Sequence, residues 1–199
     1  KEAEITTRKA IELNPNYALG HSNLGGILNS LGKLKEAELY IRKAIELNPN
    51  SSVAYSNLGG ILKDLGNLEE AELSVRKAIE LNPNSFDAYS NLGGILKDLG
   101  NLKEAELYIR KAIKLNPNYA FAHLYLGGIL KDLGNLKEAE LSIRKAIELD
   151  PNCASAYFSL SKLKYANESN LWINTLFSKN FLNNKNIQDQ INIYFARAN

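Results

Sequence analysis

Apolar residues recur along the chain in two alternating helical patterns, and the whole arrangement repeats every 34 residues. In the first pattern, Tyr55, Leu58, Ile61, Leu62 and Leu65 are spaced as on the buried side of one helix. The five prolines follow the same period, at Pro15, Pro49, Pro83, Pro117 and Pro151. Because proline cannot continue a helix, each one marks the end of a repeat. The pattern therefore predicts an all-α fold.

A second helix follows in each repeat. Its buried side is predicted to consist of Leu68, Ala71, Val75, Ala78 and Ile79. Gly66 separates the two helices, because glycine adopts the left-handed conformation without a Cβ penalty. Asn67 is the predicted N-cap of the second helix, and Glu70 is its capping-box partner. The same box is predicted for Asn101 with Glu104 and for Asn135 with Glu138.

Small residues stand where the two helices of a repeat would meet. The predicted contacts pair Gly25 with Ala37, Gly59 with Ala71, Gly93 with Ala105 and Gly127 with Ala139. A larger side chain at either place would push the helices apart. One position of the first helix carries an aromatic residue or a histidine in every repeat, and its side chain is predicted to pack between neighbouring repeats. These residues are His21, Tyr55, Tyr89, His123 and Tyr157.

The exposed side of the second helices carries a glutamate four residues before an arginine. The pairs are Glu38–Arg42, Glu72–Arg76, Glu106–Arg110 and Glu140–Arg144. Such pairs stabilise a helix by about 0.2–0.5 kcal/mol each, and we interpret them as a solvated surface. In the stretch before Pro15, the buried side is expected to comprise Ala3, Ile5, Ala10, Ile11 and Leu13.

This repeat resembles the tetratricopeptide repeat family. The resemblance is carried by Tyr55, Leu58, Gly59, Leu62, Gly66, Ala71, Ala78 and Pro83 and by their counterparts in the other repeats. It implies a right-handed superhelical solenoid of antiparallel helix pairs, with the first helices lining a concave surface that binds peptides or proteins. We expect a partial repeat (second helix only) at 1–17, four complete repeats within 18–153, and divergent, truncated C-terminal helices at 154–199.

The chain starts within a repeat and ends in an amphipathic pattern, so we expect a fragment of a longer protein. The resemblance of the repeats implies a bacterial tandem-repeat protein. The tail carries apolar residues at helical spacing around Trp172 and again between Ile187 and Ala198. It resembles the helical segment that joins tandem repeats to a transferase domain in bacterial multidomain proteins, sulfotransferases among them. We also hypothesise that the two apolar ends complement each other between molecules, giving head-to-tail self-association.

Composition excludes several classes of function. The 199 residues carry a formal net charge of +2, with acidic and basic residues interleaved, so a nucleic-acid partner is not expected. The apolar runs are too short for a membrane span, and the single cysteine fits a cytoplasmic protein. His21 and His123 occupy packing places rather than a metal-ligand cluster. We therefore expect no catalytic residue, no metal and no cofactor.

Candidate binding residues follow from the inward-facing stripe of the first helices. They are Asn23, Asn57, Asn91, Ser56, Ser90, Lys63, Lys97, Phe121, Leu124 and Tyr125. A side-chain amide both donates and accepts, so a column of asparagines suits the backbone of an extended peptide. In this feature the repeats resemble those of the eukaryotic O-GlcNAc transferase, whose asparagine column holds peptide. The alternative is a neutral polar residue copied from repeat to repeat.

The sequence thus predicts a non-catalytic scaffold that binds an extended peptide or a protein in a concave groove. The alternative is the substrate-recognition arm of a larger multidomain transferase, such as a sulfotransferase or a glycosyltransferase. One subclass of the resembled family, the receptors for chaperone tails, holds a terminal carboxylate with Lys and Asn. Here those places are occupied by Ser22 and Gly26 or by Ser56 and Gly60, so we exclude that subclass.

Overall fold

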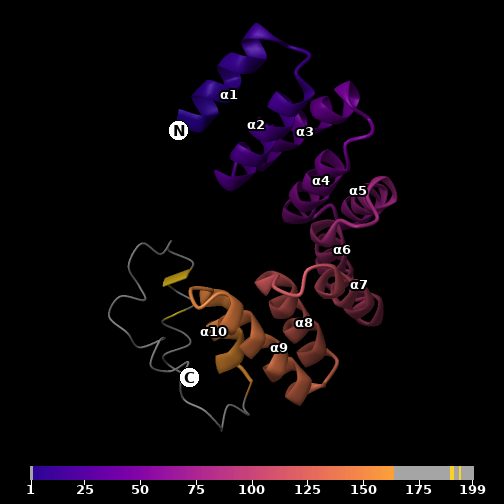
Figure 1. Ribbon diagram of the computed structural model, residues 1–199, viewed down its shortest axis with the longest axis vertical. Coiled ribbons are helices and arrows are strands. Elements are labelled where there is room, and N and C mark those ends of the chain that lie inside the picture. The colour runs from indigo at the N-terminus through magenta and orange to yellow at the C-terminus, as the bar shows by residue number, and fades with distance from the viewer. Residues whose placement is uncertain (1, 164–188, 191–192, 194–199) are drawn as a thin grey trace. The chain divides into compact units, whose positions relative to one another are not determined.

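The computed structural model describes residues 2–163, 189–190 and 193. Within these residues the named elements are all helices, and none is a strand (Figure 1). They are α1 (Glu2–Leu13), α2 (Ala18–Ser30), α3 (Leu34–Leu47), α4 (Ser52–Asp64), α5 (Leu68–Leu81), α6 (Phe86–Asp98), α7 (Leu102–Leu115), α8 (Ala120–Asp132), α9 (Leu136–Leu149) and α10 (Ala154–Ser161). The predicted all-α class is confirmed.

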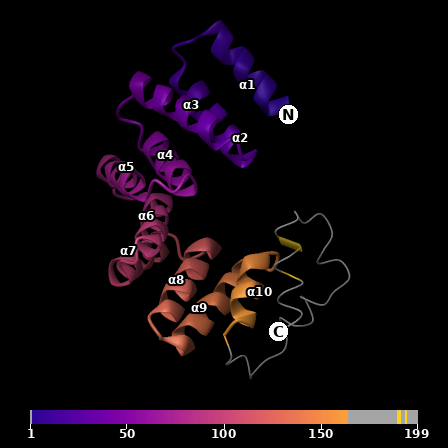
Figure 2. The ribbon, with the colours of Figure 1, turned by 180° about the vertical axis from the view of Figure 1, so that it is seen from behind.

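The chain divides into two compact units, Lys1–Gly100 and Asn101–Asn199. In the first unit α2 packs on α3 and α4 packs on α5, and these pairs stack through contacts of α3 with α4 and α5 with α6. In the second unit α8 packs on α9, while α7 lies against α8 and α9 against α10. The paired helices lie side by side in both Figure 1 and Figure 2. Consecutive helix pairs form a solenoid, as the repeat predicts.

The two helices of a pair meet at a glycine with almost no clearance. A Cβ atom on Gly59 would lie 2.2 Å from Val75 Cγ2 and 3.1 Å from the carbonyl oxygen of Ala71. The same crowding recurs at Gly25 and at Gly127. These three contacts confirm the predicted close packing of glycine against the alanine turn. Gly93 and Ala105 belong to different units, and their pair stays a prediction.

The helix ends agree with the sequence in one respect and differ in another. Gly66 has a φ of 84°, so the predicted left-handed glycine is confirmed. The capping box is wrong: Asn67 stands at the N-cap of α5 but makes no side-chain hydrogen bond there. Glu70 instead forms an ion pair with Arg42 at 2.7 Å. A charged partner on the neighbouring repeat thus replaces the backbone N–H group as the ligand of this carboxylate.

The same correction applies to the other predicted boxes. Asn101 and Asn135 are N-caps without a side-chain hydrogen bond. Serines cap two first helices instead. The hydroxyl oxygen of Ser51 accepts from the N–H of Ala54, and that of Ser85 accepts from the N–H of Ala88.

Arginines connect neighbouring second helices in addition to their own helix. Arg42 contacts Glu38 on α3 and Glu70 on α5, and the hydrogen bond with Glu70 is the main cause that raises the pKa of Arg42. Arg8 makes the same two kinds of contact, to Glu4 and Glu36. The predicted pairs at a spacing of four are thus present, but each of these two arginines also spans two repeats. Sequence spacing along one helix could not reveal this second partner.

The buried side of the repeat largely follows the prediction. Leu58, Ile61, Leu62, Val75 and Ala78 are 4% exposed or less.

The expectation for α1 is wrong at three positions, and Ala3 is one of the exposed residues. Ile5 is 68% exposed and Leu13 is 77% exposed. Leu39 and Leu73, 34 and 68 residues after Ile5, are also 69% exposed. An apolar side chain at this place of the second helix therefore faces outward in several repeats.

Substituting Gly59 with leucine should test the helix contact. We expect Gly59→Leu to lower the free energy of unfolding by about 1–3 kcal/mol, because Val75 and the Ala71 carbonyl leave no room for a side chain. Gly60→Leu is the matched control, since a Cβ there meets nothing within 4 Å. Denaturant unfolding measures both. Equal destabilisation of the two variants would contradict the assigned contact.

Two alanine substitutions should separate a functioning cap from a residue that merely stands at a cap. Ser51→Ala should cost about 1 kcal/mol, because the Ala54 N–H group loses its acceptor. Asn67→Ala should change the free energy of unfolding by less than about 0.5 kcal/mol. Chemical denaturation with a common slope checks both values, and a larger loss for Asn67→Ala would restore the capping box.

Candidate functional site

The first helices of the first unit form one continuous side, because α2 contacts α4 and α4 contacts α6. We name the surface that these helices carry the first-helix side. It holds seven of the predicted binding residues: Asn23, Asn57, Asn91, Ser56, Ser90, Lys63 and Lys97. The structure therefore brings these residues onto neighbouring elements. The other three predicted residues lie on α8 in the second unit and are treated separately.

The asparagines differ in how much of their hydrogen-bonding capacity the chain itself uses. Asn23 is exposed and Asn57 is half-buried, and among the described residues neither side chain has a hydrogen-bond partner. The amide nitrogen of Asn91 donates to the hydroxyl of Ser56 at 3.1 Å, which ties α6 to α4. The carbonyl oxygen of Asn91 is not used by this bond. The column therefore presents both donors and acceptors.

The two predicted serines are buried and are not exposed contacts. Ser56 is 8% exposed and Ser90 is 1% exposed. Ser56 accepts the bond from Asn91, whereas the Ser90 hydroxyl has no hydrogen-bond partner within the described part of the chain.

Open space lies next to the asparagines. An added Cβ at Gly26 or at Gly60 would meet no atom within 4 Å. This contrasts with Gly25 and Gly59, one residue earlier, where the same atom would collide with the second helix. One glycine of each pair thus allows the helices to approach, and the other leaves the first-helix side without side-chain cover.

The predicted lysines lie at the C-terminal ends of the first helices. Lys63 forms an ion pair with Asp98 at 3.3 Å, which links α4 to α6. Lys97 occupies the same place on α6 and is half-buried. The ion pair with Asp98 offsets the positive charge of Lys63.

The predicted residues of α8 are aromatic and aliphatic. Phe121 is 53% exposed, and its ring lies 6.0 Å from that of Tyr119. Leu124 and Tyr125 are half-buried. This helix of the second unit therefore offers an apolar surface in place of amides.

The described residues contain no group of three or more histidine, cysteine or acidic side chains that could hold a metal ion. His21 is 7% exposed, and its Nε2 atom lies 2.8 Å from the carbonyl oxygen of Pro15. Because a carbonyl oxygen only accepts, this nitrogen is the donor. The histidine thus packs between repeats, as predicted. Cys153 is half-buried, and burial raises the pKa of its thiol.

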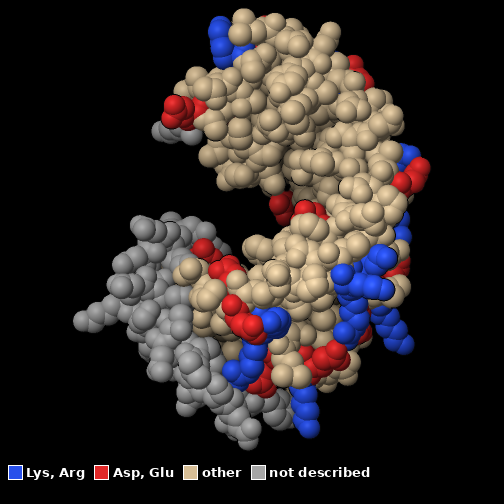
Figure 3. Space-filling view, viewed as in Figure 1, with Lys and Arg blue, Asp and Glu red and all other residues tan. Residues whose placement is uncertain are grey.

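On the face drawn in Figure 3, lysine and arginine side chains lie among aspartates and glutamates. None of the described helices combines the length and the hydrophobicity that a membrane crossing requires.

Sequence reasoning missed two pockets, which lie on the surface carried by the second helices. One involves α3, α4 and α5 in the first unit, and its equivalent involves α7, α8 and α9 in the second. The available signal was a place in the second helix that alternates between tyrosine and serine, at Tyr40, Ser74, Tyr108 and Ser142. The helices predicted around Trp172 and between Ile187 and Ala198 lie almost entirely outside the described residues, and so does the C-terminal end that the head-to-tail hypothesis needs.

Comparison with known proteins supports the repeat assignment. Models of the tetratricopeptide repeat match residues 18–51, 52–85 and 86–119, and a second such model matches 120–153. No curated protein matches the chain.

Similar solved structures include YrrB, described as a TPR protein with an unusual peptide-binding site. It is 24% identical, with a TM-score of 0.62 over 97% of this chain and 93% of that one. A thermophilic TPR protein of Thermus thermophilus is 21% identical, with a TM-score of 0.77 over 92% of this chain and 100% of that one. MamA is 25% identical, with a TM-score of 0.63 over 76% of this chain and 88% of that one. The repeat models cover most of the chain, and the helix pairs have the expected packing, so the chain belongs to the tetratricopeptide repeat family.

Proposed function

We propose that this chain is a non-catalytic scaffold that binds an extended peptide, or an extended segment of a protein, on its first-helix side. The observation that carries the proposal is the pairing of amides with open space. Asn23 and Asn57 have unused hydrogen-bonding groups, and Gly26 and Gly60 leave the adjacent surface uncovered.

The amide group explains how such a site would work. An extended peptide has N–H and C=O groups that lose water on binding, and each needs a replacement partner. One asparagine side chain offers an acceptor oxygen and two donors, so it serves a peptide N–H group and a peptide carbonyl together. Because these groups are common to all residues except proline, the column would hold many sequences. Sequence preference would then arise elsewhere.

The bond between Asn91 and Ser56 supports a positioning role for Ser56. A fixed amide loses less conformational freedom on binding than a free one does. Ser56 holds the nitrogen of Asn91 and leaves its oxygen for a ligand. Ser90 occupies the equivalent place on α6. We therefore assign Ser56 as a support of the site, whereas the Ser90 hydroxyl holds no asparagine in the described part of the chain.

Charged and apolar residues would supply preference. Lys63 and Lys97 lie at the helix ends of the first unit, where an acidic side chain of the ligand could compete with Asp98 for Lys63. Phe121, Leu124 and Tyr125 would contact apolar side chains of a partner at the second unit. One comparison agrees with this function: YrrB is described as having a peptide-binding site.

The triple substitution of Asn23, Asn57 and Asn91 by alanine should test the site. On an array of short peptides, we expect the triple variant to lose at least about tenfold in affinity for the peptides that bind the parent chain. Three lost hydrogen bonds of about 0.5–1.5 kcal/mol each account for such a loss.

A matched control replaces Asn50, Asn84 and Asn118, which are exposed asparagines of the turns between repeats. This variant removes the same number of amides and should bind as the parent does. Circular dichroism would verify that both variants keep their helices. Unchanged affinity in the Asn23, Asn57 and Asn91 variant would contradict the proposal.

A further inference from the structure

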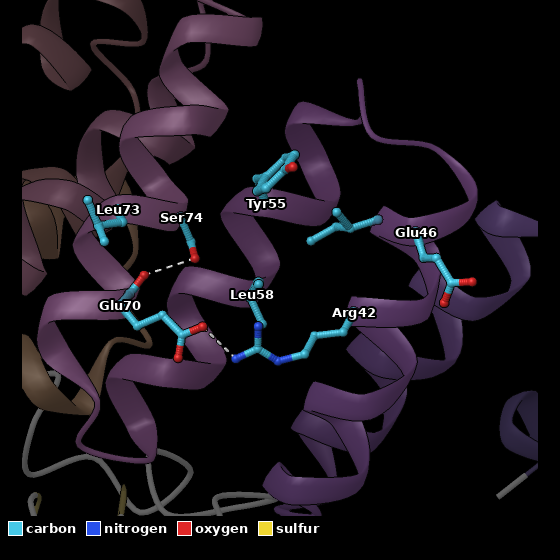
Figure 4. Close-up of a pocket in the computed structure, with 8 residues that line it drawn as sticks. Arg42, Glu46, Tyr55, Leu58, Glu70, Leu73 and Ser74 are labelled. Atoms are coloured by element: carbon cyan, nitrogen blue, oxygen red, sulfur yellow. Dashed lines mark hydrogen bonds and ion pairs between the residues drawn. The ribbon is translucent and has the colours of Figure 1, made fainter.

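We name the surface carried by the second helices the second-helix side. On this side of the first unit lies a pocket of about 510 Å³, a size that suits a small ligand group. Its lining comes from α3, α4 and α5 and includes Arg42, Ile45, Tyr55, Leu58 and Ser74 (Figure 4). The Ser74 hydroxyl donates to the Glu70 carbonyl of its own helix at 2.9 Å and so does not extend across the pocket. The cavity is therefore bounded by an aromatic ring, aliphatic groups, the guanidinium of Arg42 and the carboxylates of Glu46 and Glu70, of which Glu70 is paired with Arg42.

The same pocket recurs 68 residues later in the second unit, where its volume is about 490 Å³. Arg110, Leu126 and Ser142 replace Arg42, Leu58 and Ser74. Two lining residues change in kind: His123 stands in the place of Tyr55, and Lys114 in that of Glu46.

The equivalent place one repeat before the first pocket is filled by the chain itself. There Tyr40 stands where Ser74 stands in the next repeat. Its ring stacks on that of His21, with the ring centroids 5.8 Å apart and an angle of 29° between the planes. The guanidinium carbon of Arg8 lies 5.6 Å from the centre of the Tyr40 ring. The Nη1 atom of Arg8 lies 3.0 Å from the Tyr40 hydroxyl oxygen. This tyrosine shows which chemical group the place accommodates.

Arg8, Arg42 and Arg110 bind their glutamates in a similar way, and in each the Nη1 atom is not used for a glutamate. In Arg8, two nitrogens bind carboxylates of Glu4 and Glu36, and Nη1 remains for the tyrosine. Arg42 likewise uses Nε for Glu38 and Nη2 for Glu70. Arg110 uses the same two atoms for its own pair of glutamates. Among the described residues, the Nη1 atoms of Arg42 and Arg110 have no hydrogen-bond partner.

The histidine of the second pocket also corresponds to the histidine beside Tyr40. His123, in the second pocket, contacts the Pro117 carbonyl through Nε2 at 2.9 Å, just as His21 contacts that of Pro15. The imidazole of His123 in the second pocket is therefore held in the same way as the imidazole of His21, which stacks on Tyr40. At the rims, Leu73 and Leu141 are 69% and 68% exposed. A polypeptide lying over either pocket would cover this apolar surface.

We propose that the pockets at Ser74 and Ser142 each bind a tyrosine side chain of a partner polypeptide, whose hydroxyl contacts Arg42 or Arg110. The ring takes the place equivalent to that of Tyr40, against Tyr55 or His123, and the Nη1 atom of the arginine donates to the phenolic oxygen. This site lies on the second helices and does not depend on the asparagine column. The charge at the rim differs between the pockets, since Lys114 replaces Glu46. A tyrosine next to an acidic residue should therefore favour the second pocket.

The test uses the whole chain with methyl-labelled leucine, titrated with N-acetyl-tyrosine amide in NMR experiments. Saturable shifts are expected at Leu73 and Leu141, which border the open pockets, and not at Leu39, which lies beside Tyr40 in sequence. Ser74→Tyr should abolish the shift at Leu73 and preserve that at Leu141, so the second pocket reports that the variant is folded. Tyr40→Ser should create a new saturable shift at Leu39.

The matched ligand is N-acetyl-phenylalanine amide, which lacks the hydroxyl group. It should bind on the order of tenfold more weakly, because a hydrogen bond to a charged donor is lost. The proposal is overturned if neither Leu73 nor Leu141 shows a saturable shift, or if Ser74→Tyr leaves the shift at Leu73 intact. Equal affinity for the two amides would overturn the assignment of tyrosine.

Discussion

The structure depends on how closely the two helices of each repeat approach. At Gly59 the backbone of the first helix comes so near to the second that a single added carbon would overlap Val75. This contact fixes the distance between the two helices. Gly59 faces the second helix, whereas the next residue, Gly60, faces open space. One consequence is a first-helix side with open space at Gly60 and a second-helix side that carries arginines and exposed leucines. Both candidate binding surfaces follow from this one constraint.

The helix pairs could be predicted because their signals are local. Residues such as Leu58 and Val75 repeat at helical spacing, and Gly66 needs a conformation that glycine alone adopts easily. Contacts between repeats could not be predicted in the same way. Glu70 has the spacing of a capping partner, yet Arg42 of the preceding repeat takes its carboxylate. Likewise Ile5 is apolar and at helical spacing, but it is exposed.

The candidate site shows the same division. That Asn57 faces the first-helix side follows from helical geometry, and so does its place beside Gly60. The hydrogen bond from Asn91 to Ser56 joins residues 35 apart in sequence and required the structure. The pockets were missed because Ser74 carries no signal by itself. Only the comparison with Tyr40, and with the contacts that its ring makes, shows what a serine at this place leaves empty.

The central claim is that the asparagine column binds the backbone of an extended peptide. The most direct measurement is a crystal structure of the chain with a peptide selected from the array. We expect a peptide N–H or C=O group within about 2.7–3.2 Å of the Asn57 side-chain amide, with the peptide passing over Gly60. A bound peptide that contacts none of Asn23, Asn57 and Asn91 would contradict the account.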